Sequence, residues 1–228
     1  ISFQTQPGTM TAIVGTSGSG KSTIAKLMAG FWDVTSGTVR FGGQDIRNIP
    51  FGQLMDEISY VAQDNFLFDK SIRENIRMGI PDASDGEVEA AAKAANCHDF
   101  IMQLEQGYDT MAGDAGDRLS GGERQRITIA RAILKQASVI ILDEATAYAD
   151  PENEALIQQA ISKLVAGKSL IVVAHRLNTI RNADQILVVA NGEIVGRGIQ
   201  KELLQNCPLY RKMWQDYAGS IEGGTEDV

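Results

Sequence analysis

The stretch Gly15-Thr-Ser-Gly-Ser-Gly-Lys21-Ser22 has the spacing G-x-x-x-x-G-K-[ST] of a phosphate-binding loop. The apolar run from Met10 to Val14 precedes it and predicts a buried strand. A helix ended by Gly30 is predicted after it, because apolar residues recur at helical spacing: Ile24, Leu27, Met28 and Phe31. A strand, a glycine-rich loop and a helix start bring backbone N–H groups and the positive end of a helix to one point. The sequence therefore predicts a binding site for a nucleoside triphosphate.

The residue types in this loop have predicted tasks. We expect Lys21 to reach the β- and γ-phosphates and the hydroxyl of Ser22 to ligate Mg²⁺. The alternative is an ordinary glycine-rich turn, which the flanking strand and helix disfavour. The predicted nucleotide contacts in the loop are Gly15, Thr16, Ser17, Gly18, Ser19, Gly20, Lys21, Ser22 and Thr23.

Composition argues against several classes of protein. The 228 residues suit one large or two small domains, and the 43% hydrophobic content is ordinary for a globular chain. No apolar run approaches the ~20 residues that span a bilayer. A net charge of −8 without a basic run argues against a nucleic-acid partner. Cys97 and Cys207 are too isolated for a disulfide framework or a zinc site, so reduced thiols are expected.

The middle of the chain predicts a helical segment inserted into an α/β core. Short strands are expected over 38–41, at a sheet margin, and over 58–62. From about Asp64 to Lys135 the pattern is mostly helical, and it begins with the aromatic cluster Phe66-Leu-Phe68. Ser84-Asp-Gly-Glu87 is a capping box, followed by one apolar helical face: Val88, Ala91, Ala92 and Ala95.

The α/β pattern then resumes. Val139 to Leu142 is an uninterrupted apolar run, typical of a parallel strand buried on both faces. Asp150-Pro151 has the residue types of a helix start. The predicted buried stripe of that helix is Leu156, Ile157, Ala160, Ile161 and Leu164. Leu170 to Ala174 predicts the next buried strand.

The C-terminal part predicts a hairpin and a helix. Asn191-Gly192 joins two short strands, 186–189 and 194–195, with strong hairpin-turn chemistry. One last amphipathic helix is expected to carry Leu203, Leu204, Tyr210, Met213 and Trp214. The acidic, glycine-containing tail after Ala218 is expected to be disordered.

Polar residues stand at the ends of predicted strands, on the edge where α/β proteins bind ligands. Asp143 is expected to hold Mg²⁺ through its water shell. Glu144 is a candidate base for an attacking water, although taken alone it fits a solvated acid at a loop start better. His175 is a candidate site residue or a core histidine. Gln63, where the strand 58–62 ends, completes the group.

A second anion site is predicted far from the first in sequence. Leu119-Ser-Gly-Gly-Glu123 precedes a helix, at whose start Ser120, Gly121 and Gly122 would present a hydroxyl and N–H groups. One nucleotide does not need two such sites in one chain. The pattern therefore predicts a head-to-tail pair of chains with nucleotide between them.

In combination these motifs resemble the nucleotide-binding domain of ATP-binding cassette (ABC) transporters, over nearly the whole chain. Residues 15–22 match Walker A, 139–143 match Walker B and 120–123 match the family signature. The resemblance implies ATP and Mg²⁺ as cofactors and a P-loop NTPase core, with a mostly parallel sheet, an antiparallel β margin and an inserted helical subdomain. It implies catalytic roles for Glu144, His175 and Gln63, metal contacts for Ser22, Gln63 and Asp143, and a D-loop role for Asp150.

The resemblance extends to the exporter-type subgroup through three segments: 63–68, 72–76 and 110–116. It implies an ATPase domain over 1–218 with a helical subdomain at about 64–135, and a tail over 219–228. In that subgroup a transmembrane domain is usually fused N-terminally. The abrupt start at Ile1 then suggests a piece of a longer polypeptide, whose ATPase domain pairs with a second one at the cytoplasmic face of a membrane.

Two departures from the family pattern and one alternative accompany this interpretation. The aromatic residue that the family stacks on adenine, upstream of Walker A, is missing from this sequence. The D-loop has Ala147-Tyr-Ala-Asp150 where Ser-Ala-Leu-Asp is commoner, and 151–154 resembles members linked to siderophore traffic, some of which import. A soluble ABC ATPase not coupled to transport is the alternative function. The cargo, the direction of transport and the identity of the partner cassette stay open.

Overall fold

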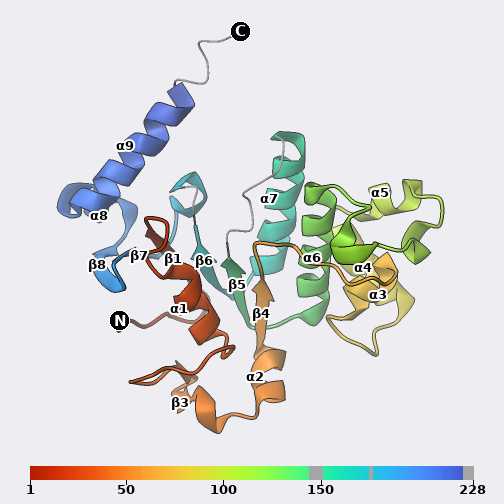
Figure 1. The fold of residues 1–228 in the computed structure, drawn as a ribbon, viewed down its shortest axis with the longest axis horizontal. Helices are drawn as coiled ribbons and strands as arrows, with labels where there is room; N and C mark the ends of the chain where they lie inside the picture. The colour runs from red at the N-terminus through yellow and green to blue at the C-terminus, as the bar shows by residue number, and fades with distance from the viewer. Residues whose placement is uncertain (144–150, 175–176, 223–228) are drawn as a thin grey trace. The chain divides into compact units, whose positions relative to one another are not determined.

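The computed structural model of the chain describes residues 1–143, 151–174 and 177–222 (Figure 1). They form two compact units. The first unit comprises Ile1–Asn48 and Ser169–Val228, and the second comprises Ile49–Lys168. The predicted helical subdomain at about 64–135 falls within the second unit, and its boundaries stay a prediction.

The sheet of the first unit is built around β1 (Met10–Gly15). β1 pairs in parallel with β6 (Ser169–Val173) on one side and with β7 (Gln185–Ala190) on the other. β8 (Glu193–Gly198) pairs with β7 in antiparallel orientation, which confirms the predicted hairpin. Its turn residues Asn191 and Gly192 have φ angles of 48° and 76°, the left-handed backbone that a two-residue hairpin turn of this type requires.

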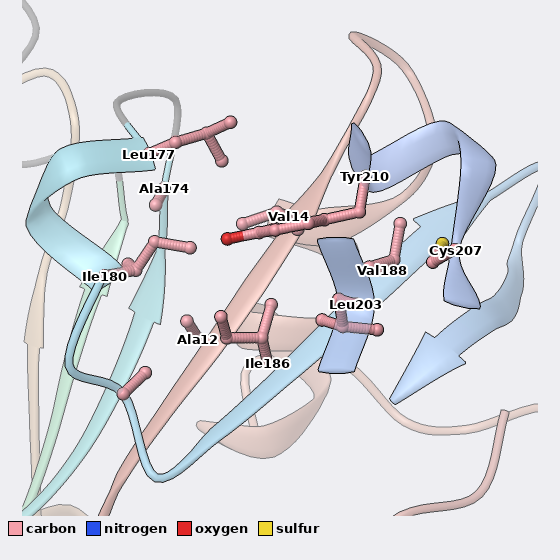
Figure 2. Close-up of a cluster of buried hydrophobic side chains, with 11 residues drawn as sticks. Ala12, Val14, Ala174, Leu177, Ile180, Ile186, Val188, Leu203, Cys207 and Tyr210 are labelled. Carbon is pink, nitrogen blue, oxygen red and sulfur yellow. The ribbon is translucent and has the colours of Figure 1, made fainter. Parts of the chain in front are cut away.

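One hydrophobic cluster covers a face of this sheet (Figure 2). Alternate residues of β1 and β7 point to the same side, and two C-terminal helices and the 3₁₀ helix η4 (Leu177–Ile180) complete the cluster. Figure 2 shows the ring of Tyr210 extending toward Val14 over the sheet. The labelled members are Ala12, Val14, Ala174, Leu177, Ile180, Ile186, Val188, Leu203, Cys207 and Tyr210.

The C-terminal helix is divided, so the prediction of a single last helix was wrong. α8 (Gln200–Asn206) ends before Cys207, and α9 (Pro208–Glu222) begins at the following proline. Pro208 has no N–H to continue α8, and it disfavours a helical backbone at Cys207, which has φ −116° and ψ 103°. α9 continues to Glu222, so the predicted tail begins too early.

Residues 38–48 form a small structure separate from the main sheet of this unit. β2 (Arg40–Phe41) and β3 (Gln44–Asp45) pair with each other in an antiparallel sheet of their own, followed by the 3₁₀ helix η1 (Ile46–Asn48). The predicted strand over 38–41 is therefore shorter than expected, and it does not lie at the margin of the main sheet. The turn at Gly42-Gly43, with φ angles of 56° and 84°, reverses the chain so that β3 pairs with β2.

The second unit contains two parallel strands and most of the helices. β4 (Ile58–Val61) pairs with β5 (Val139–Asp143), and the register places Tyr60 opposite Ile141. The central helix α6 (Gly121–Lys135) packs against α3, α4 and α7 (Figure 1). The other helices are α2 (Phe51–Glu57), α3 (Ile72–Arg77), α4 (Asp85–Ala94), α5 (His98–Gln103), α7 (Pro151–Val165), η2 (Gly107–Asp109) and η3 (Asp114–Gly116).

Capping boxes begin three helices of this unit, α3, α4 and α6. At the start of α4 the Glu87 N–H donates to Ser84 Oγ at 3.3 Å, and the Ser84 N–H donates to Glu87 Oε2 at 2.8 Å. The predicted capping box is therefore confirmed, and the predicted apolar face of α4 is buried. A cap of this kind stabilises a helix by about 1 kcal/mol.

Each unit contains one buried cysteine. Cys97 in the second unit and Cys207 in the first are both free thiols, as predicted. Burial raises the pKa of Cys97 to about 12, because a thiolate at this position would lose its hydration.

Candidate functional site

The glycine-rich loop lies between β1 and α1 (Lys21–Met28), as predicted. Gly18 and Gly20 have φ angles of 73° and 99°, in the left-handed region that favours glycine. Gly20 is the N-cap of α1 and provides no side-chain acceptor for the first helical N–H groups. A helix start without a side-chain cap presents backbone donors and a positive dipole end to an anion.

The loop approaches the end of β7 too closely for any larger residue at Gly15. A Cβ atom added to Gly15 would lie 2.1 Å from the carbonyl oxygen of Val189. The Gly192 N–H of the hairpin also donates to the Ser19 carbonyl oxygen, at 3.3 Å. The β7–β8 hairpin therefore packs against the glycine-rich loop and stabilises its conformation.

The amino group of Lys21 lies inside the loop. Its Nζ donates to the carbonyl oxygens of Gly15 at 3.1 Å and Thr16 at 3.0 Å, and the residue is 5% exposed. The hydroxyl of Ser19 is buried and has no hydrogen-bond partner within the part of the chain that the structure describes. A buried cation and an unsatisfied hydroxyl in one glycine loop fit a polyanionic ligand.

Two predicted metal-site residues lie at the carboxyl ends of neighbouring strands of the second unit. Asp143 is the last residue of β5 and is buried, whereas Gln63 lies two residues beyond β4 and is exposed. Because β4 and β5 are parallel, their carboxyl ends lie at the same edge. Ser22, the third predicted ligand, is half-buried on the first turn of α1 in the first unit.

One contact of Asp143 was missed by the sequence analysis. The hydroxyl of Tyr60 donates to Asp143 Oδ2 at 2.6 Å. Burial raises the pKa of Tyr60 far above its usual range, and the hydrogen bond to Asp143 raises it further, so the phenol stays a donor. Tyr60 belongs to none of the sequence motifs, so the contact follows only from the pairing register of β4 and β5.

The signature residues lie at the N-terminus of α6. Ser120 is the exposed N-cap, whose Oγ accepts from the Glu123 N–H at 3.3 Å, and Gly121 and Gly122 begin the helix. A Cβ atom added to Gly121 would meet nothing within 4 Å. The arrangement forms the predicted helix start in the second unit, with Gly121 half-buried and Gly122 buried.

Three predicted site residues, Glu144, Asp150 and His175, lie outside the described residues. Their roles therefore stay predictions from the sequence. Across 1–143, 151–174 and 177–222, the structure contains no group of three or more His, Cys, Asp or Glu side chains that would hold a metal ion without other ligands.

A cavity of about 220 Å³ lies in the second unit, between β4 and α6. Its wall includes Tyr60, Asn65, Phe66, Thr128, Arg131 and Lys135. Burial lowers the pKa of Arg131 to about 10, and its Nε donates to the Asn75 carbonyl oxygen at 2.8 Å. Phe66 of this wall and Phe68 are 43% and 46% exposed, and their rings pack edge to face with centroids 5.1 Å apart.

Comparison with known families identifies the class of protein. The model of the ABC transporter family matches residues 1–147, more than half of the chain. The chain therefore belongs to the ABC transporter family, and the predicted resemblance is confirmed.

Individual relatives agree with this assignment. The mycobactin import ATP-binding/permease protein IrtA of Mycolicibacterium smegmatis is 51% identical over 215 residues, covering 94% of this chain and 25% of that protein. Human ATP-binding cassette sub-family B member 6 is 49% identical over 222 residues, covering 97% of this chain and 26% of that protein. The chain thus spans about a quarter of the length of these relatives.

A solved structure has the same fold. A bacterial Atm1-family ABC exporter with ATP bound matches with a TM-score of 0.89 and 42% identity, over 95% of this chain and 38% of the other. The predicted α/β fold of an ABC ATPase is thereby confirmed. None of the helices within the described residues is both long and apolar enough to cross a bilayer.

Proposed function

We propose that the chain binds and hydrolyses ATP as the nucleotide-binding domain of an exporter-type ABC transporter, and that hydrolysis drives a substrate across a membrane. The observation that carries the proposal is the loop around Lys21, with its buried amino group, unsatisfied Ser19 hydroxyl and uncapped helix start. Each of these features is completed by a phosphate group.

Binding of the triphosphate replaces contacts within the loop. Lys21 Nζ now donates to two carbonyl oxygens, and phosphate oxygens are stronger acceptors for a cation. The loop glycines keep Cβ atoms away from the ligand, so backbone N–H groups approach the phosphates. The other proposed contacts in the loop are Thr16, Ser17, Ser22 and Thr23.

Ser22, Gln63 and Asp143 offer a hydroxyl, an amide oxygen and a carboxylate, which are hard oxygen donors suited to Mg²⁺. When bound, the ion neutralises phosphate charge and lowers the barrier to phosphoryl transfer. Asp143 is buried and held by Tyr60, so its carboxylate is ordered in advance. Gln63 lies at the same strand edge, from which it senses the ion.

The hydrolytic roles come from the resemblance alone. Glu144 polarises the attacking water and accepts its proton, and His175 contacts the γ-phosphate. Asp150 acts between the two paired domains. These three residues lie outside the described part of the chain.

Two such domains pair head to tail, with Ser120, Gly121 and Gly122 of one facing the phosphates bound by the other. The exposed position of Ser120 at the N-terminus of α6 supports this arrangement. The partner is a second ABC ATPase domain, identical or paralogous. Closure with ATP and opening after hydrolysis then couple the chemistry to movement.

A transmembrane domain, fused N-terminally in the parent protein, docks beside the Phe66 and Phe68 rings. Their exposure supports docking over the alternative, packing inside the helical subdomain. The ATPase domain then lies at the cytoplasmic face of the membrane. The name of one relative specifies import and that of the solved structure specifies export, so the direction for this chain stays open.

A lysine substitution tests ATP hydrolysis directly. Lys21→Ala should reduce ATP binding and turnover by at least about 10²-fold, since it removes the charge that faces the phosphates. Lys26→Ala is the matched control, because Lys26 is on the same helix but contacts the Trp32 ring. Equal turnover in both variants would contradict the proposed phosphate site.

Membrane coupling is tested separately. An antibody to this chain should detect a membrane-bound polypeptide much heavier than 24.6 kDa in fractionated cells. A soluble band near that mass would favour the alternative, an ABC ATPase not coupled to transport.

A further inference from the structure

The Tyr60 side chain contacts the Asp143 carboxylate without belonging to any motif of the sequence. The 2.6 Å distance between the phenol oxygen and Asp143 Oδ2 is in the short range found for O–H donors to carboxylates. Asp143 is 5% exposed, so bulk water has little access to compete for this contact. A hydrogen bond of this kind fixes a carboxylate more firmly than an exposed neutral one would.

Strand register explains how the two groups meet. Tyr60 on β4 lies opposite Ile141 on β5. Asp143 is two residues beyond Ile141, so it projects to the same face of the pair. Both partners of the hydrogen bond therefore come from paired strands, and the contact forms without any ligand.

We propose that Tyr60 is a positioning residue for the metal step, with its hydroxyl holding one oxygen of Asp143 so that the other oxygen serves the Mg²⁺–nucleotide. The inference rests on the proposed function and adds a residue to that site. A carboxylate has two oxygens with about four acceptor positions, and the hydrogen bond from Tyr60 occupies one of those on Oδ2. Partners of this kind orient metal ligands, and their loss typically weakens metal binding or activity 10- to 100-fold.

The test compares the 228-residue chain with its Tyr60→Phe variant, which keeps the ring and removes the hydroxyl. Mn²⁺ replaces Mg²⁺, and its binding is measured by electron paramagnetic resonance with a non-hydrolysable ATP analogue present. The Kd for Mn²⁺ should rise about 10-fold, which is the lower end of the 10- to 100-fold range for losing a group that orients a metal ligand. The Kd for the analogue without metal should change less than about twofold, because Tyr60 acts through Asp143.

Tyr108→Phe is the matched control. It removes the hydroxyl of a buried tyrosine in the same unit, and this hydroxyl lies 2.8 Å from His98 Nδ1. This variant should bind Mn²⁺ as the wild-type chain does. In an Asp143→Asn background, Tyr60→Phe should cause no further loss, since the positioned carboxylate is already gone.

Three outcomes would overturn the inference. The Kd for Mn²⁺ could be unchanged in Tyr60→Phe, or the loss could be the same with and without Asp143. Tyr60→Phe could also lower the thermal midpoint of the metal-free chain far more than Tyr108→Phe while leaving Mn²⁺ binding intact, which would show a purely structural role. Failure of the wild-type chain to bind Mn²⁺ with nucleotide is a different result, because it would overturn the proposed function itself.

Discussion

The side chain of Asn75 binds both backbone polar groups of Phe68. Asn75 Oδ1 accepts from the Phe68 N–H at 2.9 Å, and Asn75 Nδ2 donates to the Phe68 carbonyl oxygen at 2.9 Å. Asn75 is completely buried, and Arg131 Nη2 also donates to its Oδ1 at 3.1 Å. The Asn75 amide therefore satisfies both the N–H and the C=O of Phe68, as a paired strand would, and holds this exposed aromatic segment in place.

Replacement of Asn75 by alanine should destabilise the chain by about 3 kcal/mol, because it leaves buried polar groups without partners. The measurement is the free energy of unfolding from urea titration. Asn206→Ala, at an exposed position, is the control and should change stability by less than about 0.5 kcal/mol. A similarly small change in Asn75→Ala would mean that the Phe68 segment is held by other contacts.

Gly15→Ala should destabilise the first unit by about 3 kcal/mol, because the new Cβ would overlap the Val189 carbonyl oxygen and push the loop from the hairpin. Gly86→Ala provides the opposite case. Gly86 lies within α4, a Cβ there would meet nothing within 4 Å, and alanine is the better helix former by up to about 1 kcal/mol. Chemical denaturation of both variants should therefore give changes of opposite sign.

Glu144→Gln should lower the turnover of ATP by about 10²-fold or more while ATP binding persists, because the amide keeps the shape but cannot accept the proton. Steady-state hydrolysis and equilibrium nucleotide binding measure the two effects separately. Near-normal hydrolysis would remove Glu144 from the catalytic role.

Ser120→Ala should weaken ATP-dependent dimerisation. The same substitution also removes the cap of α6, so Ser84→Ala is needed as the control, since it removes an equivalent capping box from α4. Each change should cost about 1 kcal/mol of stability, whereas only the first should shift the monomer–dimer equilibrium in analytical ultracentrifugation. Equal sedimentation of the two variants would argue against the head-to-tail pair.

The capping carboxylate of α4 predicts a pH dependence. Hydrogen bonds from the Ser84 side chain and backbone lower the pKa of Glu87 below its ordinary 4.5. A carboxyl whose pKa is lowered in the folded state stabilises the protein above pH 4.5, and this contribution is lost as the pH falls through the folded pKa. The stability difference between wild type and Glu87→Gln should therefore shrink from pH 7 to pH 3. Glu89→Gln, on the same helix, should show a smaller difference than Glu87→Gln at pH 7.

The sequence correctly predicted the elements that depend only on residues close together in the chain. The glycine loop after β1, the hairpin turn at Asn191 and the capping box at Ser84 each depend on a few consecutive side chains, and each was predicted correctly. The break before Pro208 had a local signal too, but the continuous apolar periodicity outweighed it in the prediction.

The hydrogen bond between Tyr60 and Asp143 could not be predicted in this way. Its partners are 83 residues apart, and they meet only because β4 and β5 pair in one particular register. The contact between Arg131 of α6 and Asn75 of α3 could not be predicted either, because it depends on how the two helices pack. Sequence motifs therefore predict which residues carry the chemistry, whereas the contacts that hold Asp143 and Asn75 in place required the folded backbone.

The two buried cysteines give the chain a pair of internal reporters. A thiol that is closed off from solvent, and whose pKa is raised as that of Cys97 is, reacts with an alkylating reagent only after its surroundings open. Cys97 and Cys207 belong to different units, so their labelling rates record the opening of each unit independently. Peptide mass spectrometry after brief alkylation would therefore resolve which half of the domain loosens first when nucleotide is withdrawn.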